Sequence, residues 1–200
     1  MEPETAKAES RSLGDELILP REQPGTGDAQ VSPLDSQQQL WPLKIGNSWD
    51  YHVVVFDSTG KVSDYGNTSL SISSDTVAGN ETWYNVYDNG TGIYYTNRSD
   101  GLWIMSNGLQ TILYKYPGNT GNSWNFFADS VTIESTDTLV STTLNKYICY
   151  LYRIFYKGKP IADDYLSPGV GLVAEDYYSS TISGEVYLKN SLSLISISLK

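Results

Sequence analysis

The chain has 200 residues, 23 acidic and 13 basic side chains and a formal net charge of −10 at pH 7. This acid excess argues against nucleic acid or an anionic membrane surface as partner, because both recruit clustered lysine and arginine. A single cysteine and a single histidine exclude an internal disulfide, a cysteine-based zinc site and any multi-histidine metal site. We therefore expect no metal and no cofactor. No run of about 18 apolar residues encodes a transmembrane segment.

Residues 1–39 differ in composition from the rest of the chain. They hold eight acids, three bases and four of the eight prolines, whereas all 25 aromatic residues lie beyond position 40. So little apolar surface cannot offset the entropy lost on ordering the backbone, about 1–2 kcal/mol per residue. We predict a flexible acidic spacer over 1–39. The alternative is an extension docked through Leu17, Ile18 and Leu19.

The first residues, Met1-Glu2-Pro3-Glu4, contain neither the basic nor the apolar region of a signal peptide. An acidic spacer ahead of a domain nevertheless commonly follows an export signal or lipid anchor. We interpret the chain as a mature form whose signal sequence is missing, and expect it in the periplasm, on the cell surface or secreted. A cytoplasmic protein with a ragged N-terminus is the alternative.

From residue 40 onward the dominant hydrophobic period is two. Apolar and polar residues alternate through Trp49–Val53, Ser69–Ser73 and Ser183–Lys189, and sequences rich in Gly, Asn and Asp separate such runs at short intervals. These patterns predict a single all-β domain over 40–200. We expect an antiparallel sandwich or an open (half) barrel of about ten strands. The apolar phase of the last strand changes after Leu194, which predicts a bulge there.

An internal similarity suggests two repeated units. Residues 41–51 and 116–126 both have the pattern aromatic-Pro-x-x-x-Gly-Asn-Ser-Trp-Asx-aromatic, and Ile72–Thr76 resembles Ile133–Thr138 with one insertion. We predict pseudo-repeats that begin near 41 and 116, with coincidence of a common turn as the alternative. Trp49 and Trp124 would then each be a first inward side chain of a strand, with a structural role in the core.

A second local motif, Tyr165–Val173, predicts a tight turn. Pro168 and Gly169 suit the two central positions of a type II turn, the second of which requires a positive φ. Gly171 would let the next strand bulge or pass close to a neighbour. We assign structural roles to these three residues.

Taken together, the motifs at 41–51, 117–124 and 165–173 resemble those of uncharacterised bacterial cell-envelope lipoproteins and secreted β-domains. In that group an aromatic-Pro-Leu-x-x-Gly-x-x-Trp-x-Tyr opening is followed by a Pro-Gly-Val-Gly-Leu-Val hairpin. The resemblance covers roughly residues 40–200. It implies a curved half-barrel similar to lipoprotein carriers, and an envelope location, but no particular activity.

Nothing in the sequence forms a standard catalytic constellation. His52 shares a strand face with Asp50, opposite Trp49, so we expect it on the solvent side. Cys149 lies in an apolar strand, where a free cysteine acts as a small hydrophobe. The remaining option is a pair of carboxyls, since Asp163-Asp164 and Glu175-Asp176 could meet across a hairpin as in a glycosidase. We interpret these four instead as solvated charges at a sheet edge.

Aromatic residues are in surplus. Eight tryptophans and tyrosines fall between residues 83 and 116, more phenolic hydroxyls than a core of this size can pair. An aromatic-lined concave face suits an apolar or sugar ligand. The alternative is cross-strand aromatic pairing that only stabilises the sheet. The ligand-binding candidates are Trp83, Tyr84, Tyr94, Tyr95, Trp103 and Tyr114.

The leading functional hypothesis is a non-catalytic extracytoplasmic β-domain of a bacterial envelope or secreted protein, acting by binding or assembly. Its partners would be an apolar or sugar ligand, other envelope proteins or copies of itself. One alternative is a carbohydrate- or lipid-binding module with an aromatic platform. A second is a self-assembling structural subunit, and a third is a carboxylate-based hydrolase.

Overall fold

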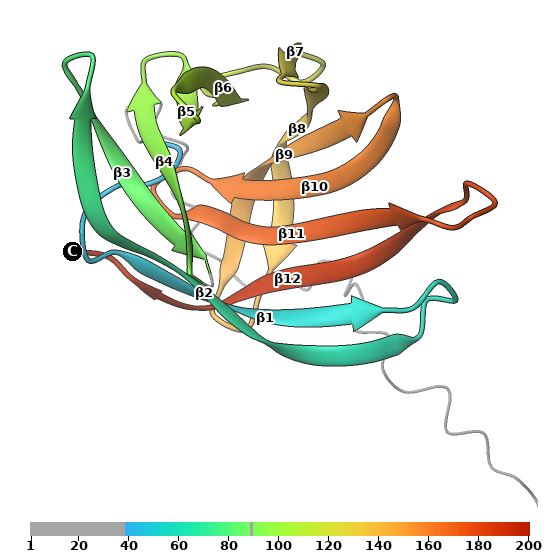
Figure 1. Cartoon of the computed structure of the whole chain (residues 1–200). Coiled ribbons are helices and arrows are strands. Elements are labelled where there is room, and N and C mark those ends of the chain that lie inside the picture. The colour runs from blue at the N-terminus through green and yellow to red at the C-terminus, as the bar shows by residue number, and fades with distance from the viewer. Residues whose placement is uncertain (1–38, 89) are drawn as a thin grey trace, which may run out of the picture. The chain divides into compact units, whose positions relative to one another are not determined.

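The computed structural model describes residues 39–88 and 90–200, which form one antiparallel sheet of twelve strands (Figure 1). The predicted spacer over 1–39 lies, except for Gln39, outside these residues. The strands are β1 (Ser48–Phe56), β2 (Val62–Ala78), β3 (Glu81–Asp88), β4 (Thr91–Arg98), β5 (Gly101–Ser106), β6 (Leu109–Lys115), β7 (Ser123–Phe126), β8 (Asp129–Ser141), β9 (Lys146–Tyr156), β10 (Lys159–Ser167), β11 (Gly171–Ser180) and β12 (Val186–Ser198). In this part of the chain no helix has the length and apolar character required to span a membrane.

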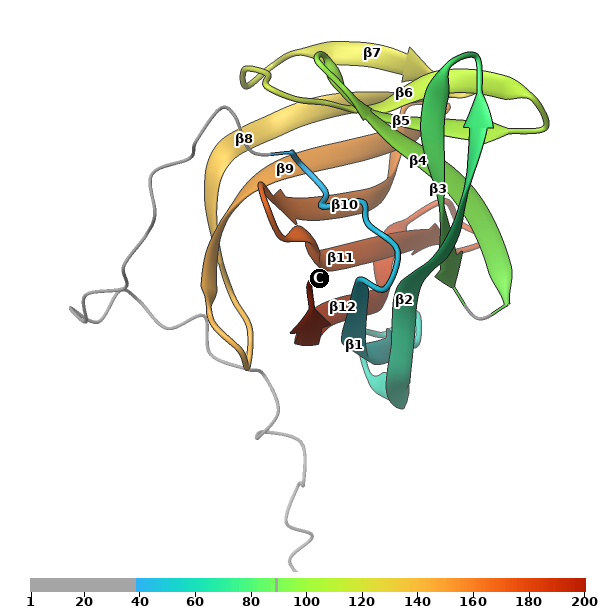
Figure 2. The ribbon, with the colours of Figure 1, turned by 90° about the vertical axis from the view of Figure 1, so that its left-hand side faces the viewer.

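The strand order is β6-β5-β4-β3-β2-β1-β12-β11-β10-β9-β8-β7. The first and last strands therefore pair at the centre of the sheet, and β6 and β7 form its two edges. The sheet curls strongly, so that both edges lie at the same end of the molecule (Figure 2). Of the two predicted architectures, the sandwich and the open barrel, the fold is therefore the open barrel. No second sheet is present among the described residues, so the sandwich alternative is wrong. The sheet has twelve strands, slightly more than the predicted number of about ten.

Alternation places one side of each strand inside the curl. In β1, Trp49 and Tyr51 are fully buried, while Asp50 and His52 between and beyond them are half-buried. The partner strand β12 keeps its core contacts by a bulge: Asp50 pairs with Ser196 and Tyr51 with Leu194, which leaves Ile195 unmatched. The phase change after Leu194 correctly predicted this bulge.

The two similar motifs form loops with the same backbone hydrogen bonds. The Gly46 amide donates to Ile72 O at 2.8 Å, and the Ile72 amide donates to Asn47 O at 2.9 Å. In the second loop, Gly121 donates to Ile133 O at 2.8 Å, and Ile133 donates to Asn122 O at 2.9 Å.

Both isoleucines of these loops are buried, and each lies in the strand that follows the repeated tryptophan strand. The loop geometry therefore supports the hypothesis of two units, β1–β6 and β7–β12. The seam between the units at β6 and β7 is bridged by side chains. The Tyr152 hydroxyl donates to Lys115 O at 2.9 Å, and the Lys115 ammonium lies 5.3 Å from the centre of the Trp124 ring.

The segment before β1 lies inside the curl and contributes to the core (Figure 2). Leu40, Trp41 and Leu43 are all buried. Its backbone is fixed from two sides, because the Gly169 amide donates to Gln39 O at 2.8 Å and the Asn97 side chain donates to Trp41 O at 2.8 Å. This segment thus fills part of the barrel interior and leaves the remaining volume described below.

Candidate functional site

A cavity of about 230 Å³ lies in the barrel interior beside Trp41. Strands β2, β3, β4, β6 and β11 contribute its walls. The aliphatic part of the lining consists of Leu70, Val86, Ile93, Leu113 and Leu172. Such apolar side chains point inward because each strand alternates in phase with its neighbour across the sheet, as in the direct pairing of Val86 with Ile93.

Three aromatic rings form one corner of the cavity. Trp41, Tyr95 and Tyr114 all line it, and the Trp41 and Tyr95 ring centres lie 5.6 Å apart at an interplanar angle of 47°. Trp41 is held against the backbone at Gly171, where an added Cβ would lie 2.4 Å from the Trp41 ring. Only glycine permits this approach, and its φ of +94° independently favours glycine. The position of the indole is therefore fixed by the turn that the sequence motif encodes.

The acidic residues near the Pro168-Gly169 turn do not lie at a sheet edge. Strands β10 and β11 are internal strands, and their register pairs Asp163 with Asp176 and Asp164 with Glu175. Asp163 is 2% exposed and Asp164 is 4% exposed. The interpretation of these residues as solvated edge charges was therefore wrong. It failed because the sequence does not reveal that three further strands extend the sheet beyond β10 and seven beyond β11.

Asp164 is buried on the cavity side of β10. The Tyr114 hydroxyl, which belongs to the cavity wall, donates a hydrogen bond of 2.5 Å to Asp164 Oδ2. Asp164 Oδ1 is buried and has no hydrogen-bond partner among the described residues. Burial raises the pKa of Asp164 well above its ordinary value, and the negative charge of Glu175 raises it further, against the opposing effect of the Tyr114 hydrogen bond. A carboxyl in this position resists ionisation.

Glu175 faces Asp164 across the hairpin and itself lines the cavity. Burial, followed by the charges of Asp88 and Asp176, raises the pKa of Glu175. The same groups affect Tyr95. Burial is the main cause of its raised pKa, and the negative charges of Asp164, Glu175 and Asp88 raise the pKa further. The cavity thus has an acidic side formed by Asp88 and Glu175, with the Asp164 carboxyl beneath it.

Asp163 points away from this cavity and has a different role. The Arg153 guanidinium donates two hydrogen bonds of 2.7 Å to its carboxylate, and the Tyr178 hydroxyl donates a third at 2.9 Å. This arrangement satisfies the buried charge within the sheet. Asp163 is therefore structural, and the two neighbouring aspartates serve opposite faces of one strand.

The six predicted ligand-binding aromatics do not form one platform. Tyr84, Tyr95 and Tyr114 pack against the barrel core. Trp83, Tyr94 and Trp103 each adjoin a core-facing residue in the same strand and so lie on the opposite face, where Trp83 is nevertheless fully buried. Only Tyr95 and Tyr114 of the six line the cavity.

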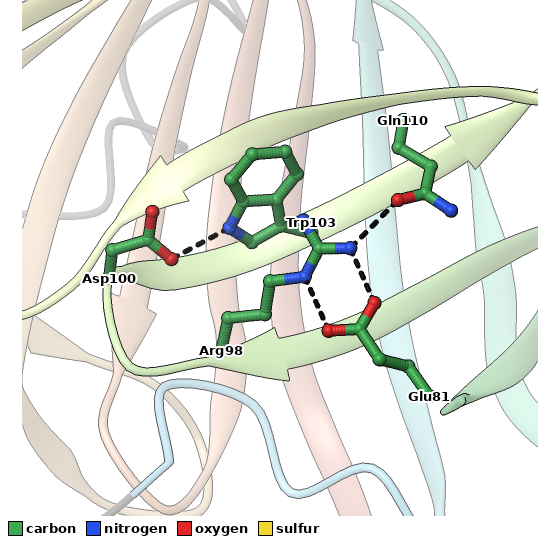
Figure 3. A network of polar contacts seen from close by, with 5 residues as sticks. All are labelled: Glu81, Arg98, Asp100, Trp103 and Gln110. Atoms are coloured by element: carbon green, nitrogen blue, oxygen red, sulfur yellow. Dashed lines mark hydrogen bonds and ion pairs between the residues drawn. The ribbon is translucent and has the colours of Figure 1, made fainter. Parts of the chain in front are cut away.

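Trp103 lies in a polar network around Arg98 (Figure 3). The Arg98 guanidinium lies 4.0 Å from the Trp103 ring centre and 5.5 Å from that of Trp83. It also forms a two-hydrogen-bond ion pair with Glu81. Because the guanidinium covers Trp103, this ring does not offer the bare surface on which a sugar would stack.

The residues assigned structural roles occupy turn and core positions. Gly169 has a φ of +78°, and the Val170 amide donates to Ser167 O at 3.0 Å across the turn. Pro168 is buried. Trp49 is fully buried and donates to Val170 O at 2.7 Å, whereas Trp124 is only half-buried. The two repeated tryptophans are thus not equivalent in burial.

The remaining nucleophile and base lie away from the cavity. His52 is on the outer side of β1, where its Nδ1 lies 3.3 Å from Asn67 Oδ1. Cys149 is buried, and burial raises the pKa of its thiol to about 12. Among the described residues no group of three or more His, Cys, Asp or Glu side chains could hold a metal ion.

The sequence did not mark Trp41 and Asp88 as site residues, and Glu175 was interpreted as an edge charge. The register of the hairpin offered one usable signal, because counting outward from Pro168-Gly169 pairs Asp164 with Glu175. No local signal shows that Asp88, at the end of β3, lies near that pair. That proximity depends on the curl of the whole sheet.

Comparison with known proteins identifies no family for this chain. No protein-family model matches the chain, and no curated protein matches it. One similar solved structure is a Bacteroides fragilis protein described as exported, with a YmcC-like fold; it is 13% identical, with a TM-score of 0.43, and the match covers 81% of this chain and 100% of that one. Another is a Parabacteroides distasonis protein described as a lipoprotein, 12% identical with a TM-score of 0.39, covering 80% of this chain and 99% of that one.

Proposed function

We propose that the chain is a non-catalytic, extracytoplasmic β-domain of a bacterial envelope or secreted protein that binds a small, largely apolar ligand inside its barrel. The observation that carries this proposal is the cavity of about 230 Å³ with aliphatic and aromatic walls. Small-molecule sites in proteins are concave, mostly apolar and equipped with a few polar groups that fix orientation. The cavity beside Trp41 has this composition.

The size of the cavity limits the ligand. An apolar cavity of about 150 Å³ is large enough to bind benzene. The volume here therefore accommodates one aromatic ring with a short substituent, or an aliphatic chain of similar bulk. A long acyl chain or an oligosaccharide would have to extend past the exposed Asp88 and Thr91 at the wall.

The extracytoplasmic location is supported by the sequence motifs and by the acidic composition of residues 1–39. Fractionation of the source bacterium with an antibody against residues 40–200 tests it. Recovery of the protein in the envelope or medium agrees with the proposal, and recovery in the cytoplasm contradicts it.

Binding is tested by NMR of the Leu, Ile and Val methyl groups while small phenyl compounds are added. The panel contains 2-phenylethanol, 2-phenylethylamine and 3-phenylpropionate, which differ in charge at similar size. We expect at least one compound to shift the methyl signals of Leu70, Val86 and Ile93 in a saturable manner.

Two variants of adjacent residues in β4 provide the matched control. Ile93→Trp would place a larger side chain in the cavity, whereas Tyr94→Trp changes the neighbouring residue on the outer face. Ile93 is 37% exposed, so the barrel can accept the larger side chain there. The first variant should abolish the shifts and the second should retain them. Shifts that persist in Ile93→Trp, or their absence with every compound, would contradict binding in this cavity.

A further inference from the structure

The charged groups around the cavity all have the same sign. Asp88 and Glu175 line it, and Asp164 lies behind the Tyr114 ring. No lysine, arginine or histidine contributes to the cavity wall among the described residues. Two arginines of neighbouring strands are paired with other acids: Arg98 with Glu81 and Arg153 with Asp163.

The other elements around the acids add no basic side chain to the described part of the wall. Strands β2, β4 and β6 contribute to the wall only aliphatic side chains, Thr91 and the phenols of Tyr95 and Tyr114. Burial and the nearby carboxyls raise the pKa of both phenols, so the tyrosines stay uncharged. A neutral phenol can donate a hydrogen bond to a carboxylate but carries no positive charge to neutralise it. The segment before β1 contributes the Trp41 indole.

Two buried polar atoms here have no hydrogen-bond partner among the described residues: Asp164 Oδ1 and Trp41 Nε1. An unsatisfied buried polar group costs about 1–3 kcal/mol. Such atoms are uncommon in folded proteins. Of the five among the described residues, Trp41 Nε1 belongs to the cavity wall and Asp164 Oδ1 to the carboxyl beneath it, whereas those of Trp83, Asn85 and Trp124 lie outside the lining. This second observation is independent of the charge count.

We propose that the ligand of this cavity is a small apolar amine, bound with its ammonium group against Glu175 and its apolar part between Trp41, Tyr95 and the aliphatic wall. The inference rests on the proposed binding function and specifies its ligand class. An ammonium group donates hydrogen bonds to carboxylate oxygens, which is stronger than neutral hydrogen bonding. It is also attracted to the faces of aromatic rings within about 6 Å.

The same wall disfavours other small apolar ligands. A carboxylate such as a fatty acid would bring a further negative charge next to Asp88 and Glu175, and like charges in a partly desolvated site repel. A neutral alcohol would fill the apolar volume but leave the acidic side uncompensated. The three phenyl compounds named above therefore rank as amine, alcohol and carboxylate in order of decreasing affinity.

The decisive measurement compares 2-phenylethylamine with 2-phenylethanol by methyl NMR titration at pH 7 in the unmodified chain and in Glu175→Gln. We expect the amine to bind about tenfold more tightly than the alcohol, or better, which is the usual order for a charge-assisted contact. The Glu175→Gln change should weaken the affinity for the amine by a similar factor and leave the affinity for the alcohol unchanged. Asp176→Asn, the next residue on the opposite strand face, is the matched control and should change neither affinity by more than about twofold.

The outcomes separate this inference from the proposed function. Equal affinities for amine and alcohol, or an amine affinity that Glu175→Gln does not alter, overturn the amine assignment while leaving apolar binding in place. Absence of saturable shifts with all three compounds overturns both. If Glu175→Gln does not fold, Asp88→Asn at the exposed end of the cavity serves as the second variant, with the same selective loss of amine affinity expected and an unchanged affinity contradicting the assignment.

Discussion

Asp164 and Glu175 stand directly opposite each other on the adjacent strands β10 and β11, one buried beneath the cavity and the other in its wall. Opposite residues of an antiparallel pair have Cβ atoms about 4.5–5.5 Å apart, so the two carboxyls interact strongly. Two like charges at this distance in a buried setting do not both ionise readily. This pair therefore links the electrostatics of the cavity to the stability of the barrel.

The first prediction concerns stability as a function of pH. Since the pKa of Asp164 is raised in the folded state, the native chain holds a proton that the unfolded chain releases near pH 4. The contribution of Asp164 to the free energy of unfolding should therefore be fully present below that pH and be lost as the pH rises towards the raised native pKa. In Asp164→Asn the fall in the free energy of unfolding between pH 4 and pH 8 should be smaller. Urea unfolding of both chains at several pH values measures the free energy of unfolding and its dependence on pH.

The control is a carboxyl whose pKa is shifted in the opposite direction, Asp57. Hydrogen bonds from Thr59 and Lys61 lower the pKa of Asp57, so the stabilisation from this group is lost as the pH falls through the lowered native pKa. Asp57→Asn should therefore change the acid side of the profile and leave the slope above pH 5 intact. Identical slopes in the parent chain and in Asp164→Asn would contradict a raised pKa at Asp164.

The second prediction tests the contact between Gly171 and Trp41. A methyl group at Gly171 would lie 2.4 Å from the indole, whereas one at Gly158 meets nothing within 4 Å. Both glycines have positive φ, +94° and +75°, so the backbone strain of an alanine is similar at the two sites. Gly171→Ala should cost about 1–3 kcal/mol more than Gly158→Ala, the usual penalty of overpacking.

Denaturant unfolding of both glycine variants provides the comparison, and Trp41 fluorescence reports its displacement in Gly171→Ala. Equal costs would mean that the indole moves away freely. The position of Trp41, and with it the shape of the cavity, would then not depend on this turn.

The third prediction separates the two repeated tryptophans. Trp49 is fully buried and its indole N–H is hydrogen-bonded, so Trp49→Ala should destabilise by about 3–5 kcal/mol. Trp124 is half-buried and its indole N–H has no partner among the described residues. Trp124→Ala should cost clearly less. Near-zero costs at both positions would contradict a core role for the repeated motif.

The fourth prediction concerns catalysis. We expect no turnover of soluble glycans or esters, because Asp164 does not line the cavity and only Glu175 of the pair meets a ligand there. A hydrolase needs both carboxyls at the scissile bond. Assays of the parent chain, with Asp164→Asn and Glu175→Gln as controls, measure this. Turnover that disappears in either variant would make the chain an enzyme.

Local sequence patterns predicted the all-β class, the bulge after Leu194 and the glycine turns, because each depends on residues close in the chain. The cavity depends on long-range geometry. Trp41 and Asp88 meet Glu175 only through the curl of the sheet. Two of the surplus aromatic residues, Tyr95 and Tyr114, line the cavity, but alternation along β3 and β4 divided the other candidates between two faces.

The pairing of β1 with β12 has a consequence for how the barrel folds. Among the described strands, all neighbouring pairs except β1 and β12 are consecutive in sequence. Each half of the sheet can therefore assemble from hairpins. The pairing of β1 with β12, in which Trp49 lies opposite Ile197, instead joins residues separated by nearly the whole domain. Loop-closure entropy grows only logarithmically with length, but long-range pairing slows folding. We therefore expect two quickly formed meanders and a late, rate-limiting association, so that fragments 40–115 and 116–200, expressed separately, should recombine through this pairing.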